Sequence, residues 1–221
     1  YERVSGSAVY PSDVSLPNML YGAILRCPHP HAQVKKIATS KAQSIPGVHA
    51  VISGQTPAAD LPWTYSSWGI KRKSKLFDPH GRFEGETVAA VAAETPYLAW
   101  DAVRTIEVAY EVLPVVSDER AALAQEAPAV HTEGNRIGPP ASYERGDVAK
   151  GFAEADVVLE ENYRTECEIH TPMELHGCVA NWDGDRLTIW ESTQGVYRVQ
   201  KNVADILNLP LSKVRVVGHY M

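Results

Sequence analysis

The sequence has few cysteines, only Cys27, Cys167 and Cys178 among its 221 residues. Their number is odd and no two have the C-x-x-C spacing, so neither a disulfide framework nor a structural zinc site is predicted. An iron–sulfur cluster is ordinarily held by four thiolates, which this chain cannot supply. We therefore expect the three thiols to serve as small apolar residues in a core.

Long apolar runs and an excess of positive charge are also missing. No run approaches the roughly 20 apolar residues that cross a bilayer as a helix, and no basic-then-apolar signal peptide opens the sequence. The chain starts at Tyr1, so a leader could have preceded it. Its net charge of −6 gives no general attraction to nucleic acid. The sequence thus predicts no transmembrane segment and no nucleic-acid partner.

Histidine is present in enough copies to raise the question of a metal site. His29 and His31 form one close pair, and His170 and His176 form another around Glu174. Neither pair has the i, i+4 spacing of a helical zinc site, and each pair encloses a proline that disfavours helix. We therefore predict no metal held directly by this chain. The roles of His170, Glu174 and His176 stay open, because buried polar side chains are usually satisfied by backbone partners.

The first half reads as alternating strands and helices. Strands are predicted at residues 19–26 (buried), 34–38, 48–53, 87–94 and 105–114. Thr39 is the expected cap of a short helix over 40–45, and Thr95 with Pro96 the start of a helix over 96–103. Residues 54–82 are predicted to be irregular, with the basic cluster Lys71, Arg72, Lys73 and Lys75 in a solvated loop or at an anion or partner site.

The second half begins after a change in composition. Residues 116–141, in a stretch rich in Ala, Pro, Gly and Glu, are predicted to be a linker with one short helix near Glu119. Beyond it we expect a helix over 147–155, capped by Asp147, and a helix over 196–207. Strands are predicted at residues 157–167, 177–182, 186–192 and 213–218, with a hairpin at Asp183-Gly184-Asp185. The sequence ends directly after a strand, which we interpret as an incomplete second unit.

The run Ser192-Thr193-Gln194-Gly195 separates the strand over 186–192 from the following helix. Ser and Thr are good helix caps, Gly bends freely, and an exposed Gln is ordinary in a turn. The local sequence therefore favours a plain turn and gives Gln194 no function.

Four segments of the sequence occur together in an order typical of one family. They are "RVSGSAVYPSDVSLPNMLYGAILRCPHPHAQV", "FEGETVAAVAAETPYLAWDAVRTIEVAYEVLP", "HTPMELHGCVANWDGDRLTIWESTQGVYRVQ" and "LPLSKVRVVGHYM". They resemble the N-terminal portion of the molybdenum-binding large subunit of xanthine dehydrogenases and aldehyde oxidoreductases. The resemblance implies an α+β fold: an α/β hammerhead domain over 1–115, a linker over 116–141, and the first part of a mixed α/β molybdopterin-binding domain over 142–221.

The same resemblance assigns a role to the polar turn. In the family, the amide of the corresponding Gln hydrogen-bonds an apical oxygen ligand of molybdenum, so Gln194 is expected beside the cofactor without being a metal ligand. Gly195 would let the backbone approach the cofactor closely. The family's Gly-Phe-Gly segment and its general-base Glu are expected beyond Met221. No catalytic residue is therefore expected in this chain.

The resemblance implies a molybdenum hydroxylase that oxidises an aldehyde or N-heterocycle with water as the oxygen source. Electrons would pass to [2Fe–2S] clusters and FAD on other subunits or regions, and the molybdopterin could be the cytosine dinucleotide form. One alternative is a non-catalytic assembly or interface piece of such a complex, and another is an unrelated α/β binding protein. We expect a cytoplasmic location, with the periplasm left open because relatives occur in both. The substrate is not predicted.

Overall fold

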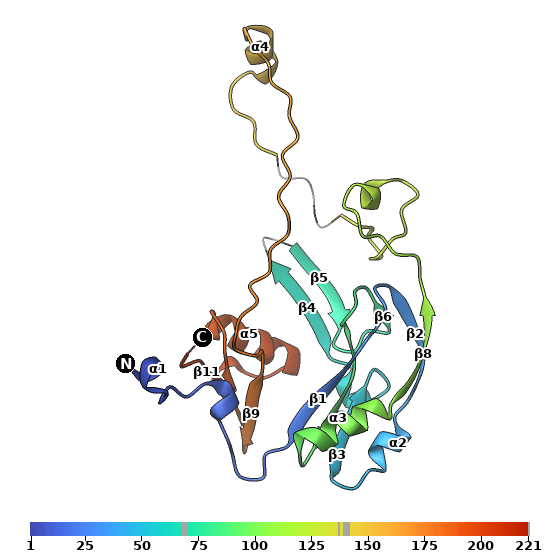
Figure 1. Cartoon of the computed structure of the whole chain (residues 1–221), viewed down its shortest axis with the longest axis vertical. Helices are drawn as coiled ribbons and strands as arrows, with labels where there is room; N and C mark the ends of the chain where they lie inside the picture. The colour runs from blue at the N-terminus through green and yellow to red at the C-terminus, as the bar shows by residue number, and fades with distance from the viewer. Residues whose placement is uncertain (68–69, 137, 139–141, 221) are drawn as a thin grey trace. The chain divides into compact units, whose positions relative to one another are not determined.

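The computed structural model describes residues 1–67, 70–136, 138 and 142–220, and it omits the side chains of residues 58 and 64–73. The chain divides into two units (Figure 1). The larger unit contains Tyr1–Arg136 and His176–Met221, and the smaller one contains Ile137–Leu175. No helix among the described residues is long and apolar enough to cross a membrane.

The first sheet of the larger unit has the antiparallel order β1–β7–β3. Its strands are β1 (Tyr21–Arg26), β3 (Val48–Ser53) and β7 (Thr87–Ala93). The central strand β7 is built from small residues, and Ala89 and Ala93 are completely buried. Small side chains let helix α3 (Pro96–Arg104) pack closely against β7 and β1. The prediction of a tightly packed strand over 87–94 is confirmed.

Helix α3 starts as its sequence predicts. The hydroxyl of Thr95 accepts a hydrogen bond from the backbone N–H of Leu98 (3.1 Å), and Pro96 occupies the first turn. The shorter helix α2 (Ser40–Gln43) begins after Thr39, but the Thr39 side chain forms no capping bond there. The predicted cap of α2 is therefore wrong. Thr39 has a helical backbone conformation, whereas a residue that caps a helix usually has an extended one.

The second sheet has the order β6–β2–β8, again antiparallel. Its strands are β2 (Ala32–Ala38), β6 (His80–Gly81) and β8 (Glu107–Val112). A bulge between Val34 and Lys36 shifts the pairing of β2 with β8. These elements lie where the sequence predicts strands, apart from the two-residue strand β6. The α+β fold class is confirmed.

Two predictions for the first half are wrong. Residues 54–82 are not irregular: after the short 3-10 turn Pro57–Ala59, β4 (Pro62–Ser67) and β5 (Ile70–Lys75) form an antiparallel hairpin. Proline and basic residues hid this pairing, although Pro62 opens an edge strand, where proline is tolerated. The strand predicted over 19–26 is not buried either, because β1 is an edge strand on which only Ala23 is fully covered.

The basic cluster of this hairpin is described only in part. Lys75 pairs with Asp60 at 2.7 Å. The side chains of Lys71, Arg72 and Lys73 lie outside the described residues, so the prediction for them is not tested.

The C-terminal part of the larger unit forms a separate three-stranded sheet, β9–β10–β11. Strands β9 (Cys178–Asp183) and β10 (Arg186–Glu191) form the predicted hairpin, with Gly184 in the left-handed region at φ 59°. Helix α5 (Val196–Leu207) then leads through the 3-10 turn Leu211–Lys213 to β11 (Val214–Val217), which runs parallel to β10. Asn208, at φ 52°, ends α5, whose bounds match the predicted helix over 196–207.

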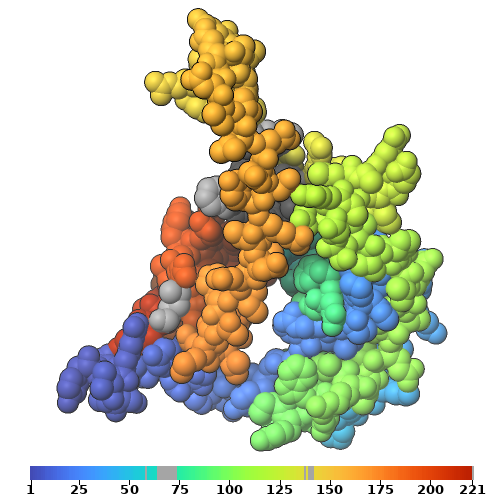
Figure 2. Space-filling view, turned by 45° about the horizontal axis from the view of Figure 1, so that its top comes forward, coloured from blue at the N-terminus to red at the C-terminus, as the bar shows by residue number. Residues whose placement is uncertain are grey.

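The described residues of the smaller unit form one helix and a long extended segment. Helix α4 (Val148–Ala153) begins where Asp147 accepts a hydrogen bond from the backbone N–H of Lys150, so its predicted cap is confirmed. The strand predicted over 157–167 is wrong, because this segment pairs with no strand in the described part of the chain. Its apolar side chains are exposed, and Figure 2 shows the orange stretch that contains it as a narrow column of atoms. Alternation predicts a strand only where a neighbouring strand is available.

Residues 118–136 form a loop that the side chain of Asn135 holds closed. The side chain of Asn135 accepts a hydrogen bond from the backbone N–H of Val130 (2.9 Å), and it donates to the carbonyls of Ala122 and Pro128 (3.0 Å each). The 3-10 turn Ala121–Leu123 lies within this loop, near the predicted short helix. The domain boundaries given above stay a prediction.

The short N-terminal helix α1 (Glu2–Ser5) and the 3-10 turn Pro11–Asp13 precede β1. Of the three cysteines, Cys27 lies in the core, as predicted. Cys167 and Cys178 are exposed, so the prediction is wrong for them. Cys167 lies on the unpaired extended segment and Cys178 at the start of the edge strand β9, where little covers either thiol.

Candidate functional site

Strands β10 and β11 are parallel neighbours joined by α5, so their carboxyl ends meet at one edge of the sheet. The polar turn 192–195 follows β10 at this edge, and residues 218–220 follow β11. In open α/β sheets, ligands bind outside the carboxyl ends of the strands. This edge is therefore the candidate site.

Hydrogen bonds fix the polar turn and the helix that follows it. The Thr193 hydroxyl accepts from the backbone N–H of Gly195 at 3.2 Å, and the carbonyl of Gly195 accepts the first helical bond, from Val199, at 3.1 Å. Further along α5, the amide of Gln200 donates to the carbonyls of Leu211 (3.2 Å) and Val214 (2.7 Å). Helix α5 is thereby held against β11, and its first turn has a fixed place at the sheet edge.

Gly218 lies directly against the polar turn. A Cβ atom at this position would come within 3.2 Å of Val196 Cγ1 and 3.3 Å of the Glu191 carbonyl oxygen. Both distances are shorter than ordinary van der Waals contacts, so a larger residue would have to push the turn away from β11.

We predict that Gly218→Val destabilises the protein by about 1–3 kcal/mol, the usual cost of overpacking. The matched control is Gly177→Val, since a Cβ at Gly177 would meet nothing within 4 Å. Unfolding of both variants by denaturant, with wild type alongside, measures the difference. Equal stabilities for the two variants would contradict the close packing of Gly218.

The Gln194 side chain is exposed at this edge, and its amide has no hydrogen-bond partner in the described part of the chain. The adjoining first turn of α5 has no side-chain cap. An uncommitted amide and uncapped backbone N–H groups can donate hydrogen bonds to an anionic or oxygen-bearing ligand. This donor chemistry fits a molybdopterin cofactor with an oxygen ligand on the metal.

The structure gives no local reason for a glycine at position 195. Its φ of −147° is accessible to any residue, and an added Cβ would meet only Arg198 Cβ at 3.6 Å. The backbone of this chain therefore does not require glycine here. The role predicted for Gly195, a close approach to the cofactor, stays a prediction.

The site also carries charged side chains. Glu191, at the end of β10, is half-buried, and burial raises the pKa of its carboxyl. The open hollow between α5 and β11 beside it has a volume of about 200 Å³. It is lined by Val196, Tyr197, Gln200, Val214, Arg215 and Val216. A ligand at this edge would therefore meet hydrogen-bond donors, the carboxyl of Glu191 and the guanidinium of Arg215.

The histidine pairs do not form a metal centre in the described residues, where no three His, Cys, Asp or Glu side chains converge on a possible ion. His170 and Glu174 belong to the smaller unit, and His176 opens the C-terminal part of the larger one. His170 and His176 are exposed and Glu174 is half-buried. Their roles stay open.

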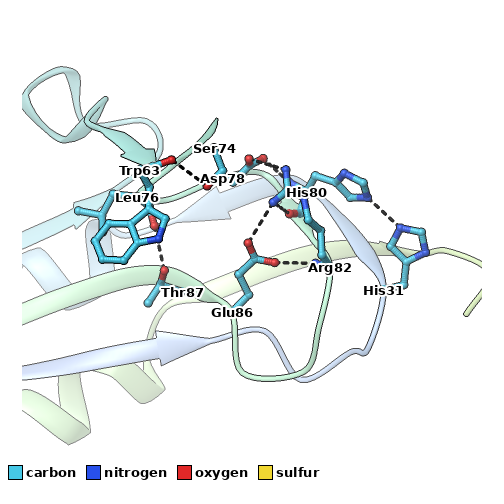
Figure 3. A network of polar contacts seen from close by, with 9 residues as sticks. All are labelled: His31, Trp63, Ser74, Leu76, Asp78, His80, Arg82, Glu86 and Thr87. Atoms are coloured by element: carbon cyan, nitrogen blue, oxygen red, sulfur yellow. Dashed lines mark hydrogen bonds and ion pairs between the residues drawn. The ribbon is translucent and has the colours of Figure 1, made fainter. Parts of the chain in front are cut away.

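Sequence reasoning missed a mostly buried ion network next to β6 (Figure 3). The guanidinium of Arg82 donates to Asp78 (2.7 Å) and to Glu86 (3.0 Å), and all three side chains are about 85% buried. Burial opposes ionisation of Asp78, but hydrogen bonds from Arg82 and from the His80 backbone outweigh it and lower the pKa of the carboxyl. The spacing of four residues between Asp78, Arg82 and Glu86 indicates ion pairs only on a helix, and this segment is not helical, so the sequence carried no signal for the network.

The comparisons with known proteins agree with the fold. Residues 5–114 match the family model described as aldehyde oxidase and xanthine dehydrogenase, a/b hammerhead domain. Residues 130–221, which include Gln194, match the model of the molybdopterin cofactor-binding domain. One relative is a probable xanthine dehydrogenase subunit from Bacillus subtilis, 36% identical over 99% of this chain. Another is the nicotinate dehydrogenase large molybdopterin subunit of Eubacterium barkeri, 35% identical over 98% of this chain.

Among solved structures, this chain is similar to quinoline 2-oxidoreductase from Pseudomonas putida 86. It superposes with a TM-score of 0.88 over 99% of this chain, at 29% identity. The chain spans 29% of that structure, 29% of the B. subtilis relative and 50% of the E. barkeri relative. These similarities therefore concern a part of each of those proteins.

Proposed function

Since the chain belongs to the family of molybdenum-binding large subunits of xanthine dehydrogenases and aldehyde oxidoreductases, we propose that it is part of a molybdenum hydroxylase. The substrate would be an aldehyde or an N-heterocycle, with water as the source of the added oxygen. The observation that carries this proposal is the uncommitted Gln194 amide, presented at the sheet edge of a molybdopterin-binding domain.

When bound, the molybdenum–molybdopterin cofactor supplies the redox chemistry of hydroxylation. The contribution of this chain is to position it. The Gln194 N–H would donate a hydrogen bond to the bound cofactor, and a neutral amide can do so without becoming a metal ligand or adding charge. Thr193 stabilises the turn that carries Gln194, and Gln200 holds the helix that follows this turn. Gly195 would let the backbone approach the cofactor closely.

The electrons would leave through [2Fe–2S] clusters and FAD on other subunits or regions, because three cysteines cannot hold these clusters. The molybdopterin could be the cytosine dinucleotide form. We place the general-base Glu outside this chain as well, and we locate the protein in the cytoplasm, with the periplasm as the alternative.

The test is to purify the full-length protein with its natural partners and to measure bound molybdenum and pterin. We expect about one molybdenum per large subunit, together with oxidation of aldehydes or N-heterocycles in which the added oxygen derives from labelled water. A folded, assembled protein without molybdenum would instead support a non-catalytic assembly role. Molybdenum present with oxygen from another source would overturn the proposed reaction.

A further inference from the structure

His31 connects the end of β8 to the ion network of Arg82. Its backbone carbonyl accepts from the N–H of Leu113 at 2.9 Å, and its ring Nδ1 lies 2.6 Å from the carbonyl oxygen of Pro114. Its other ring nitrogen, Nε2, lies 2.8 Å from Nε2 of His80 (Figure 3). His31 is 4% exposed. Two bonds from one buried residue therefore fasten the chain where it leaves the second sheet.

These contacts determine where the protons are. A carbonyl oxygen only accepts, so Nδ1 of His31 carries a hydrogen and donates it to Pro114. A single hydrogen lies between the two Nε2 atoms, and His80 supplies it when both rings are neutral. A third proton fits only on Nδ1 of His80. A fourth would place two N–H groups against each other across 2.8 Å, between two positive rings.

We propose that the His31–His80 pair is a proton-sensitive clamp, which holds Leu113 and Pro114 near neutral pH and releases the following segment when the rings are protonated. The segment concerned starts at Val115 and continues to Arg136 within the larger unit. The backbone of His80, the other member of the pair, is held in place by two hydrogen bonds. Its carbonyl accepts from Arg82 at 3.0 Å, and its N–H donates to Asp78 at 3.0 Å.

The surroundings of the clamp resist protonation. Burial, followed by the charge of Arg82 and by His31, lowers the pKa of His80, while Asp78 acts in the opposite direction. Glu86 and Asp78 both pair with Arg82. The other titratable side chains close by are His29 and Tyr110, whose rings are in edge contact, and burial followed by Cys27 raises the pKa of Tyr110 to about 12. Tyr110 is thus neutral throughout the range considered.

The direction of the pH effect follows from the lowered pKa of His80. In the open state His80 binds a proton near the ordinary histidine value of 6.5, and its lowered pKa means that the clamped pair binds the same proton less readily. Clamping is therefore complete above that pH, and it weakens as the pH falls below it. Between pH 7.5 and 5.0 the opening equilibrium therefore rises, with an upper limit of about thirtyfold for one proton that is bound only in the open state.

The measurement is amide hydrogen exchange of the full-length protein between pH 7.5 and 5.0, corrected for intrinsic exchange rates. The probe is the amide of Leu113, and the reference is the amide of Ala99, which bonds to Thr95 at 3.0 Å within α3. We expect the protection of Leu113 to fall relative to Ala99, by at most about thirtyfold. A constant ratio across this range would overturn the proposal without any variant.

Two variants identify the proton acceptor. In His80→Gln the amide can donate to His31 or, after turning over, accept from it, and it does not titrate. This variant should keep Leu113 protected at both pH values. The control His49→Gln removes an exposed histidine, bonded to Glu94, and should behave as wild type. Loss of protection at pH 5.0 in His80→Gln to the same extent as in wild type would overturn the assignment to this pair.

Discussion

Replacing Gln194 with alanine should lower kcat by a factor on the order of ten to a hundred, as expected for loss of a hydrogen bond that orients a metal site. The fold should survive, because the Gln194 side chain is exposed at a turn and its amide bonds to no described residue. The molybdenum content should therefore stay at the wild-type level. The measurement is kcat of the assembled enzyme, expressed per bound molybdenum.

The variant Gln194→Glu tests whether hydrogen-bond donation, and not side-chain size, is what position 194 requires. The two side chains have nearly the same size, but a carboxylate cannot donate a hydrogen bond and would set negative charge against an oxygen ligand. We expect a larger loss of kcat than for alanine, with partial recovery at low pH, where the carboxyl takes up a proton. The control is Gln43→Ala on α2, which removes another exposed amide and should leave kcat unchanged. Full metal occupancy with wild-type kcat in both Gln194 variants would make Gln194 an ordinary turn residue.

The elements that the sequence predicted well are those whose signals are local. Thr95-Pro96 sets the start of α3, and Asp183-Gly184-Asp185 sets the β9–β10 hairpin. Each needs only neighbouring residues to adopt its conformation. The class of fold follows from the order of such elements, and the structure confirms it.

The elements that the sequence missed depend on distant partners. The segment over 157–167 alternates like a strand, but a strand exists only where another one pairs with it. The β4–β5 hairpin shows the opposite case, in which pairing overrides a composition typical of loops. Both errors concern what lies beside a segment, which a local pattern does not report.

The candidate site divides in the same way. The turn at 192–195 is visible locally, and only the family resemblance assigned Gln194 to the cofactor. The packing of Gly218 against the Glu191 carbonyl and the His31–His80 contact join residues far apart in the sequence. No periodicity encodes such contacts, so they had to come from the structure.

Loss of Arg82 should have the largest effect on stability. Arg82→Met keeps the apolar length of the side chain but leaves Asp78 and Glu86 facing each other, 14% and 15% exposed, without a cation between them. Removing one partner of a buried ion pair costs about 3 kcal/mol, because the remaining charge stays desolvated. In a chain of 221 residues this corresponds to a fall in Tm of roughly 6–12 °C.

The matched control is Arg104→Met. Arg104 pairs with Asp101 at the same distance of 2.7 Å, but its side chain is 72% exposed, and exposed pairs contribute little. We expect its Tm to stay close to wild type. Equal falls in Tm for the two variants would show that burial does not increase the contribution of the Arg82 ion pairs to stability.

The pH dependence of these Tm values separates charge from packing. Arg82 lowers the pKa of Asp78, so its stabilising effect is complete above the ordinary carboxyl value of 3.8 and is lost as the pH falls through the lower value of the folded state. Without Arg82, burial and the nearby Glu86 raise the pKa of Asp78, and the carboxyl takes up a proton at a higher pH. The gap in Tm between Arg82→Met and wild type should therefore narrow from pH 7 to pH 4.5. A gap that stays constant would mean that Arg82 acts through its packing alone.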